Sequence, residues 1–194
     1  PSIFPIFEEA GYTVARGYND YKAKSAKAEK MILIQEEGAN PSCLPYAIDR
    51  KENDLTLAQI TESAIDFLTK GKNKGFFLMV EGGKIDWACH ANDAATVFNE
   101  VKDMDNAIKV AYEFYKKHPK ETLIVVTADH ETGAFSILDG NFETGKVDGK
   151  FNSFYHSGVP VPVFAFGPGS EQFNGWMENI DFRDKLLKAL GIKH

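Results

Sequence analysis

Four short runs of apolar residues stand out along the chain. Each is rich in β-branched or aromatic side chains, and they are Met31–Ile34, Phe76–Val80, Leu123–Val126 and Val161–Phe166. Continuous apolar runs of this length are typical of strands that helices cover on both faces, as in a parallel sheet. The pattern therefore predicts four buried strands.

The segments between these runs show helical periodicity. The first begins with the capping-box pair Thr56 and Gln59, and Gly71 is well placed to end it. The second extends from Asp93 to Lys117 with one apolar face, and a last helix of about Phe182 to Leu190 closes the chain. Strands that alternate with helices predict βαβ units. We therefore expect an α/β fold with three αβα layers and a mainly parallel sheet.

Length and composition indicate an ordinary globular protein. The 194 residues suffice for one domain with a substantial core, and 43% of them are hydrophobic and 26% charged. We expect residues 1–194 to form a single α/β domain. Residues 139–155 are expected to be a surface insertion loop, because Gly, Asn, Asp and Lys are frequent there.

Charge and hydropathy exclude several classes of partner. The net charge is −6 and no basic stripe is present, which argues against specific nucleic-acid binding. No run approaches the roughly 18 apolar residues that a membrane span needs. The first residues, Pro1–Phe4, lack the pattern of a signal peptide. Cys43 and Cys89 do not form a CxxC pair; two free buried thiols are favoured over a disulfide, which stays open.

The second apolar run is followed by a group of polar residues. Glu81 comes directly after the run and before two glycines, which places its carboxylate at the carboxyl edge of the sheet. Asp86 and His90 are four residues apart and so share one face of the helical turn that follows. A carboxylate and an imidazole at this spacing can bind one metal ion, although taken alone they are equally explained by a helical ion pair.

Two more groups of the same chemistry accompany the next strands. Asp129 and His130 follow the third apolar run, and His156 precedes the fourth. Taken alone, an Asp-His dipeptide is more typical of a helix cap and His156 of a loop. In a doubly wound sheet, however, these positions meet at the carboxyl ends of the strands. Imidazole and carboxylate ligands suit Zn²⁺, and a carboxylate-only position suits Mg²⁺, so the combination predicts a metal site.

Three segments resemble signature sequences of the alkaline phosphatase family. They are Val80–His90, Thr127–Gly133 and His156–Gly158, in this order. The resemblance extends from about Tyr12 to Ile180 and implies an alkaline-phosphatase-like α/β fold. It also implies a phosphate monoester hydrolase with two Zn²⁺ ions and one Mg²⁺ ion, in which a serine forms a covalent phosphoseryl intermediate.

The resemblance also implies a set of ligands and partners. The ligands would be Asp86, His90 and His156 for one zinc ion, Asp129 and His130 for the other, and Glu81 for the magnesium ion. The implied partners are a phosphate monoester and inorganic phosphate, and a second copy in a homodimer. The implied location is periplasmic or secreted. Trp87 stands at a position that varies in the family and either tunes phosphate binding or packs.

The sequence also departs from the family pattern. The nucleophilic serine of the family lies in an Asp-Ser-Ala or similar segment, and this sequence contains no Asp-Ser pair. Arg16, Arg50 and Arg183 match no position of the phosphate-binding arginine. We therefore expect a carboxyl-terminal portion of an alkaline phosphatase, with a truncated sheet that favours self-association and with no activity by itself. A related metallo-phosphodiesterase or sulfatase-type hydrolase and a non-catalytic metal-binding domain are the alternatives.

Overall fold

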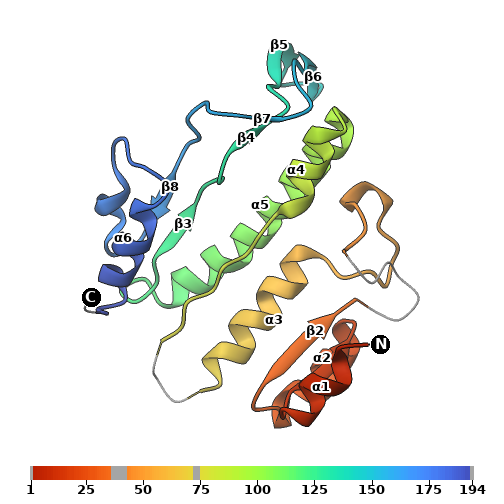
Figure 1. The fold of residues 1–194 in the computed structure, drawn as a ribbon, viewed down its shortest axis with the longest axis vertical. Helices are drawn as coiled ribbons and strands as arrows, with labels where there is room; N and C mark the ends of the chain where they lie inside the picture. The colour runs from red at the N-terminus through yellow and green to blue at the C-terminus, as the bar shows by residue number, and fades with distance from the viewer. Residues whose placement is uncertain (1, 36–42, 72–74, 193–194) are drawn as a thin grey trace. The chain divides into compact units, whose positions relative to one another are not determined.

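The computed structural model describes residues 2–35, 43–71 and 75–192 (Figure 1). Contacts between Cα atoms divide the chain into two compact units, residues 1–85 with 94–111 and residues 86–93 with 112–194. Helices and strands are mixed along the chain, which agrees with the expected α/β class. The assignment of residues 1–194 to a single domain, with 139–155 as an insertion, stays a prediction.

The first unit alternates helices and short strands from its beginning. Its elements are α1 Phe4–Glu9, β1 Thr13–Arg16, α2 Tyr18–Lys24, η1 Ser25–Lys27, β2 Met31–Ile34, η2 Ala47–Asp49 and α3 Leu57–Thr69, together with the first parts of α4 Gly83–His90 and α5 Ala94–Lys117. Strands β1 and β2 pair in parallel, with Thr13 opposite Met31. The predicted capping box is confirmed, because Gln59 N donates to Thr56 Oγ1 at 3.0 Å and Thr56 N to Gln59 Oε1 at 3.0 Å.

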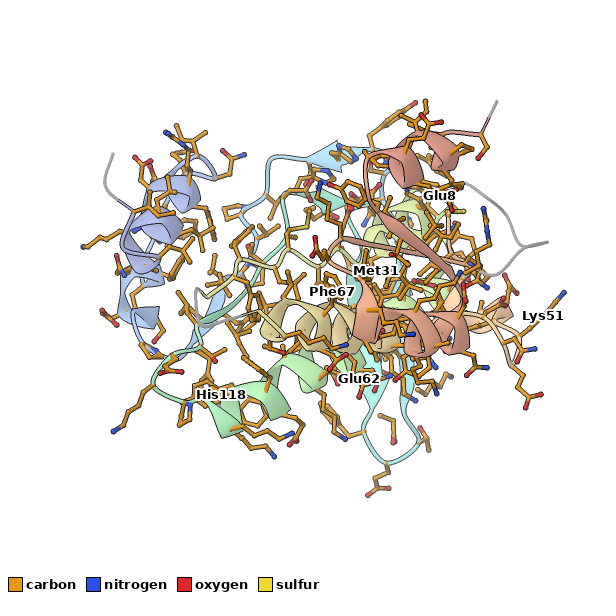
Figure 2. The ribbon with its side chains drawn as sticks, turned by 90° about the horizontal axis from the view of Figure 1, so that it is seen from below. Glu8, Met31, Lys51, Glu62, Phe67 and His118 are labelled. Atoms are coloured by element: carbon orange, nitrogen blue, oxygen red, sulfur yellow. The ribbon has the colours of Figure 1, made fainter. Side chains whose placement is uncertain are left out.

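Strand β1 and helices α2 and α3 each contribute buried residues to the first unit. Ile65 is buried, as are Tyr21 of α2 and both central residues of β1. The Tyr21 hydroxyl donates to Ser63 O at 2.7 Å and to Asp66 Oδ2 at 2.9 Å. Burial, followed by the neighbouring Asp66 carboxylate, raises the pKa of Tyr21. Figure 2 labels exposed Glu62 and half-buried Phe67 on the same helix.

A buried ion pair fixes the segment before α3. Arg50 donates from Nη1 and Nη2 to the two carboxylate oxygens of Asp103 in α5, at 2.9 and 2.7 Å. Asp103 Oδ2 also accepts from Leu57 N at 3.4 Å. One turn earlier, the buried Glu100 accepts from Ala47 N at 2.6 Å. The acids of α5 therefore bind the irregular segment 47–57 through specific hydrogen bonds.

The second unit is built from short antiparallel pairs. Its strands are β3 Ile124–Val126, β4 Glu131–Thr132, β5 Ser136–Asn141, β6 Lys146–Lys150, β7 His156–Ser157 and β8 Phe164–Phe166, and its last helices are η3 Ser170–Phe173 and α6 Asp181–Ala189. The pairs are β3 with β8, β4 with β7 and β5 with β6. Phe166 packs against Tyr112 and Tyr115 of α5, with ring centroids 5.6 and 4.7 Å apart.

The strands differ in detail from those expected. Among the described residues they form four two-stranded sheets, and only β1 with β2 is parallel. The run Phe76–Val80 belongs to none of these strands, and the last apolar run forms a strand only at Phe164–Phe166. An apolar run reports a tendency to be buried, whereas a strand also needs a neighbour for its backbone N–H and C=O groups. Pro160 and Pro162 lack the N–H that a longer ladder would use.

Both cysteines are free thiols, so the prediction of free thiols is confirmed, and that of burial holds for Cys89 alone. Cys89 is buried in α4, and Cys43 is partly buried. The Gly-rich segment after β4 forms the β5–β6 hairpin, whose residues are almost all exposed. Among the described residues, no helix combines the length and the apolarity that crossing a bilayer requires.

Candidate metal centre

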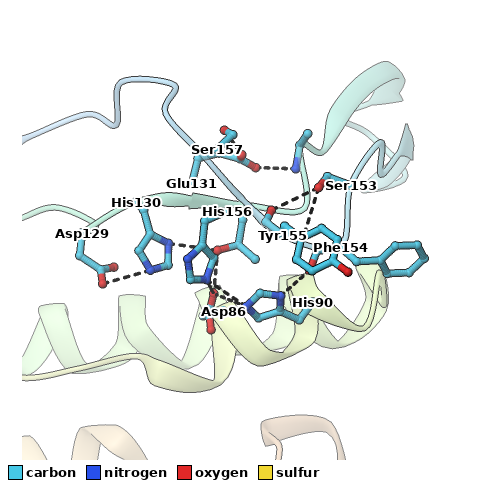
Figure 3. A network of polar contacts seen from close by, with 12 residues as sticks. Asp86, His90, Asp129, His130, Glu131, Ser153, Phe154, Tyr155, His156 and Ser157 are labelled. Atoms are coloured by element: carbon cyan, nitrogen blue, oxygen red, sulfur yellow. Dashed lines mark hydrogen bonds and ion pairs between the residues drawn. The ribbon is translucent and has the colours of Figure 1, made fainter.

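Helix α4 and the β4–β7 pair carry the candidate metal centre (Figure 3). Asp86 and His90 lie one turn apart on α4, as their spacing predicts. Strand β4 directly follows His130, and its register with β7 sets Thr132 opposite His156. The antiparallel pairing thus brings His130 and His156 together, and their rings stack with centroids 3.6 Å apart.

Three potential ligand atoms form a triangle at the centre of the cluster. Asp86 Oδ1 lies 3.4 Å from His90 Nε2 and 3.4 Å from His156 Nε2. The two Nε2 atoms are 3.0 Å apart. Tetrahedral zinc with bonds of about 2.0–2.1 Å to nitrogen and oxygen sets its ligand atoms about 3.3 Å apart. The triangle therefore has nearly the dimensions of one face of a zinc tetrahedron, so these residues fit the ion.

The orientation of His90 is set from outside the cluster. Its Nδ1 lies 2.6 Å from the backbone carbonyl oxygen of Phe154. A carbonyl oxygen can only accept, so Nδ1 carries the proton and donates it. The lone pair is then on Nε2, which is the atom that faces Asp86 and His156. This is the usual arrangement of a histidine that binds a metal ion.

The second acid–histidine pair lies beside the first group. Asp129 Oδ2 is 3.2 Å from His130 Nε2, and the Asp129 side chain is 86% exposed. Ligand atoms of Asp86, His130 and His156 all lie within 4.8 Å of one another. The structure thus brings five of the six candidate residues close together, and their division between two zinc ions stays a prediction. Glu81 belongs to the first unit, and its assignment to a magnesium ion stays a prediction.

Sequence reasoning missed Glu131, which stabilises the turn that follows β4. Its carboxylate accepts from Ala134 N at 2.6 Å and from the Ser157 hydroxyl. Gly133 lies between them with φ of +87°, and an added Cβ would approach Phe151 Cδ1 to 2.8 Å. The Glu-Thr-Gly sequence after His130 was a usable signal, because an acid before a glycine turn can accept backbone N–H groups.

Cys89 lies next to the ligands in sequence but is not placed to join them. It is buried, and burial, followed by the charges of Asp86 and Glu131, raises the pKa of its thiol. A metal ion binds the thiolate form, which this environment disfavours. The donor set of the cluster is therefore imidazole nitrogen and carboxylate oxygen.

Comparison with known proteins finds relatives of a single enzyme family. A family model described as alkaline phosphatase matches residues 21–149. Alkaline phosphatase 4 of Bacillus subtilis is 31% identical over an aligned length of 251 residues. The alignment covers 95% of this chain and 53% of the relative. The solved alkaline phosphatase of the Antarctic bacterium TAB5 is 34% identical with a TM-score of 0.85, covering 100% of this chain and 56% of that one. A variant of the TAB5 enzyme, described with Mg bound in the M3 site, is 32% identical with a TM-score of 0.83 over the same shares.

Proposed function

Because the chain belongs to the alkaline phosphatase family, we propose that it supplies the zinc ligands of a phosphate monoester hydrolase. It spans about half the length of the relatives that it matches. The observation that carries the proposal is the triangle of Asp86, His90 and His156, whose edges of 3.0–3.4 Å suit one zinc ion. Substrates of this activity are phosphate monoesters, and inorganic phosphate is a product.

We assign three of the chain's residues to one zinc ion, two to a second zinc ion and one to a magnesium ion. The proposed ligands are Asp86, His90 and His156 for one Zn²⁺, Asp129 and His130 for a second Zn²⁺, and Glu81 for Mg²⁺. Bound zinc supplies a Lewis acid at a phosphoryl oxygen. His90 keeps its proton on Nδ1, donated to Phe154 O, so that Nε2 stays a ligand. The exposed Asp129 leaves its side of the site accessible to a charged ester.

We propose that the chain by itself binds zinc without turning over substrate. The sequence contains no Asp-Ser pair to act as the family's nucleophile segment. Zinc affinity is measured by competition with a chromogenic chelator, and turnover with 4-nitrophenyl phosphate. We expect at least one tight zinc site per chain, loss of that site in His156→Ala, and no change in His118→Ala, an exposed histidine at the end of α5.

Four outcomes of these two assays contradict the proposal. Absence of zinc binding, or equal binding by the His156→Ala variant, removes the metal centre. Turnover that rises in proportion to the concentration of the chain contradicts the proposal that the chain binds zinc but lacks a nucleophile. Metal binding with hydrolysis of diesters or sulfate esters favours a related metallo-hydrolase instead.

We further propose a periplasmic or secreted location and a homodimer, both from the family resemblance. Large apolar side chains on the surface of the second unit support self-association: Trp176 is 86% exposed and Ile180 77% exposed. Sedimentation velocity across a concentration series tests the dimer. A monomer at all concentrations contradicts it.

A further inference from the structure

The hydroxyl of Thr132 lies between the two groups of predicted zinc ligands. Thr132 is only 9% exposed and stands in β4, paired with His156 of β7. Its Oγ1 donates to Asp86 Oδ1 at 2.6 Å. The same atom is 3.2 Å from His130 Nδ1. One hydroxyl therefore contacts a ligand of each proposed zinc ion.

The direction of both hydrogen bonds follows from the chemistry of the groups. A hydroxyl has one proton and two lone pairs, whereas a carboxylate can only accept. The Thr132 proton therefore goes to Asp86, and toward His130 the hydroxyl acts as acceptor. In the neutral imidazole, Nδ1 of His130 then carries the ring proton. Its Nε2 and Asp129 Oδ2, 3.2 Å apart, are then two acceptors that a shared cation would hold together.

We propose that Thr132 is a positioning residue that orients Asp86 and selects the metal-binding tautomer of His130 at the same time. The inference rests on the proposed zinc site. The tautomer of His90 is fixed by its hydrogen bond to the backbone carbonyl of Phe154, which orients that one proposed ligand. Thr132 acts on two ligands because its hydroxyl both donates and accepts, and so it couples the two zinc positions.

Because Thr132 is buried, a water molecule cannot easily replace its hydroxyl group. Thr132 has little exposed surface, so a water molecule cannot take the place of the hydroxyl without rearranging the strand pair. Valine has nearly the shape of threonine but neither the donor nor the acceptor. Serine keeps both. The pair Thr132→Val and Thr132→Ser therefore separates the hydroxyl from the volume of the side chain.

Zinc affinity of the full chain is the first readout. Loss of a hydrogen-bond partner of a metal ligand lowers metal affinity by about 10- to 100-fold in other proteins. We expect a loss of at least about tenfold in Thr132→Val and less than about threefold in Thr132→Ser. The matched control is Thr61→Val, because Thr61 is 2% exposed and its hydroxyl donates at 2.8 Å to Leu57 O within its own helix. Wild-type zinc affinity in Thr132→Val overturns the proposal.

The tautomer of His130 is the second readout and needs no metal. Nitrogen-15 NMR of the metal-free chain, under conditions in which the imidazole is neutral, shows which ring nitrogen carries the proton. We expect Nδ1–H in the wild type and in Thr132→Ser, and a mixture with Nε2–H in Thr132→Val. Nε2–H in the wild type overturns the proposal by itself, even where the valine variant fails to fold. If the wild type binds no zinc, the proposed function fails while this spectrum still tests Thr132.

Discussion

Two carboxylates, one in each unit, have opposite surroundings. Asp103 of the first unit, with a side chain 10% exposed, receives both nitrogens of the Arg50 fork. Asp86 of the second unit is 34% exposed, and two imidazole Nε2 atoms face it at 3.4 Å. Arg50 brings a permanent positive charge that completes its ion pair. The imidazole nitrogens near Asp86 bring lone pairs instead of a permanent charge. A bound cation would therefore stabilise this cluster.

The difference separates a structural acid, Asp103, from a proposed ligand, Asp86. Asp103 accepts from both terminal nitrogens of Arg50 and from Leu57 N. Around Asp86 the Thr132 hydroxyl donates to Oδ1, and His90 and His156 bring nitrogen atoms that are themselves potential ligands. Removing Asp103 is therefore expected to affect folding, whereas removing Asp86 is expected to affect metal binding.

The largest expected effect is on stability, in Asp103→Ala. This variant leaves the guanidinium of Arg50, 14% exposed, without its partner. Breaking a buried ion pair costs about 3–5 kcal/mol of unfolding free energy. Urea denaturation measures the change, and the double variant Arg50→Met with Asp103→Ala is expected to regain at least half of it. A loss below about 1 kcal/mol in Asp103→Ala would show that solvent replaces the pair.

The second effect is on metal binding, in Asp86→Asn. The amide keeps the size of the side chain and still accepts from Thr132, but it loses the negative charge that faces the histidines. We expect zinc affinity to fall by more than about 100-fold, with a change of less than about 1 kcal/mol in metal-free stability. Asp148→Asn, an exposed acid of β6, is the control and should retain wild-type affinity. Equal zinc affinity in Asp86→Asn and the wild type would show that Asp86 does not bind the metal ion, and that the proposed difference from Asp103 is wrong.

The smallest effect is a pH dependence at an exposed ion pair of the first unit. Hydrogen bonding to Lys70, and then to Tyr21, lowers the pKa of Asp66 below its usual 3.8. Because the pKa is lower in the folded state, the stabilisation is complete above about pH 4 and disappears as the pH falls through the folded value. The Asp66 side chain is 54% exposed, so Asp66→Asn should lose at most about 0.5 kcal/mol at pH 7.

Urea titrations of wild type and Asp66→Asn at several pH values measure this difference. We expect the two curves of stability against pH to converge below pH 4. A constant difference down to pH 2 would show that the hydrogen bond to Tyr21 matters through its geometry and not through the charge of Asp66.

Local features of this protein were predictable from local signals. The capping box at Thr56 and Gln59 forms the start of α3, and the long amphipathic pattern from Asp93 forms α5, because both involve residues within one or two turns. The run Phe76–Val80 was predicted as a strand and is not one in the structure. Its apolar composition could not show whether a neighbouring strand is available.

The candidate site divides in the same way. By itself the sequence determined the types of ligand and the Asp86–His90 spacing on one turn, because side-chain chemistry and helical geometry are local. Only the tertiary structure decided that β4 pairs with β7, which stacks His130 on His156. It also decided that the Thr132 hydroxyl meets Asp86, a residue 46 positions earlier. Such partners depend on the register of distant segments, and no pattern along the chain specifies that register.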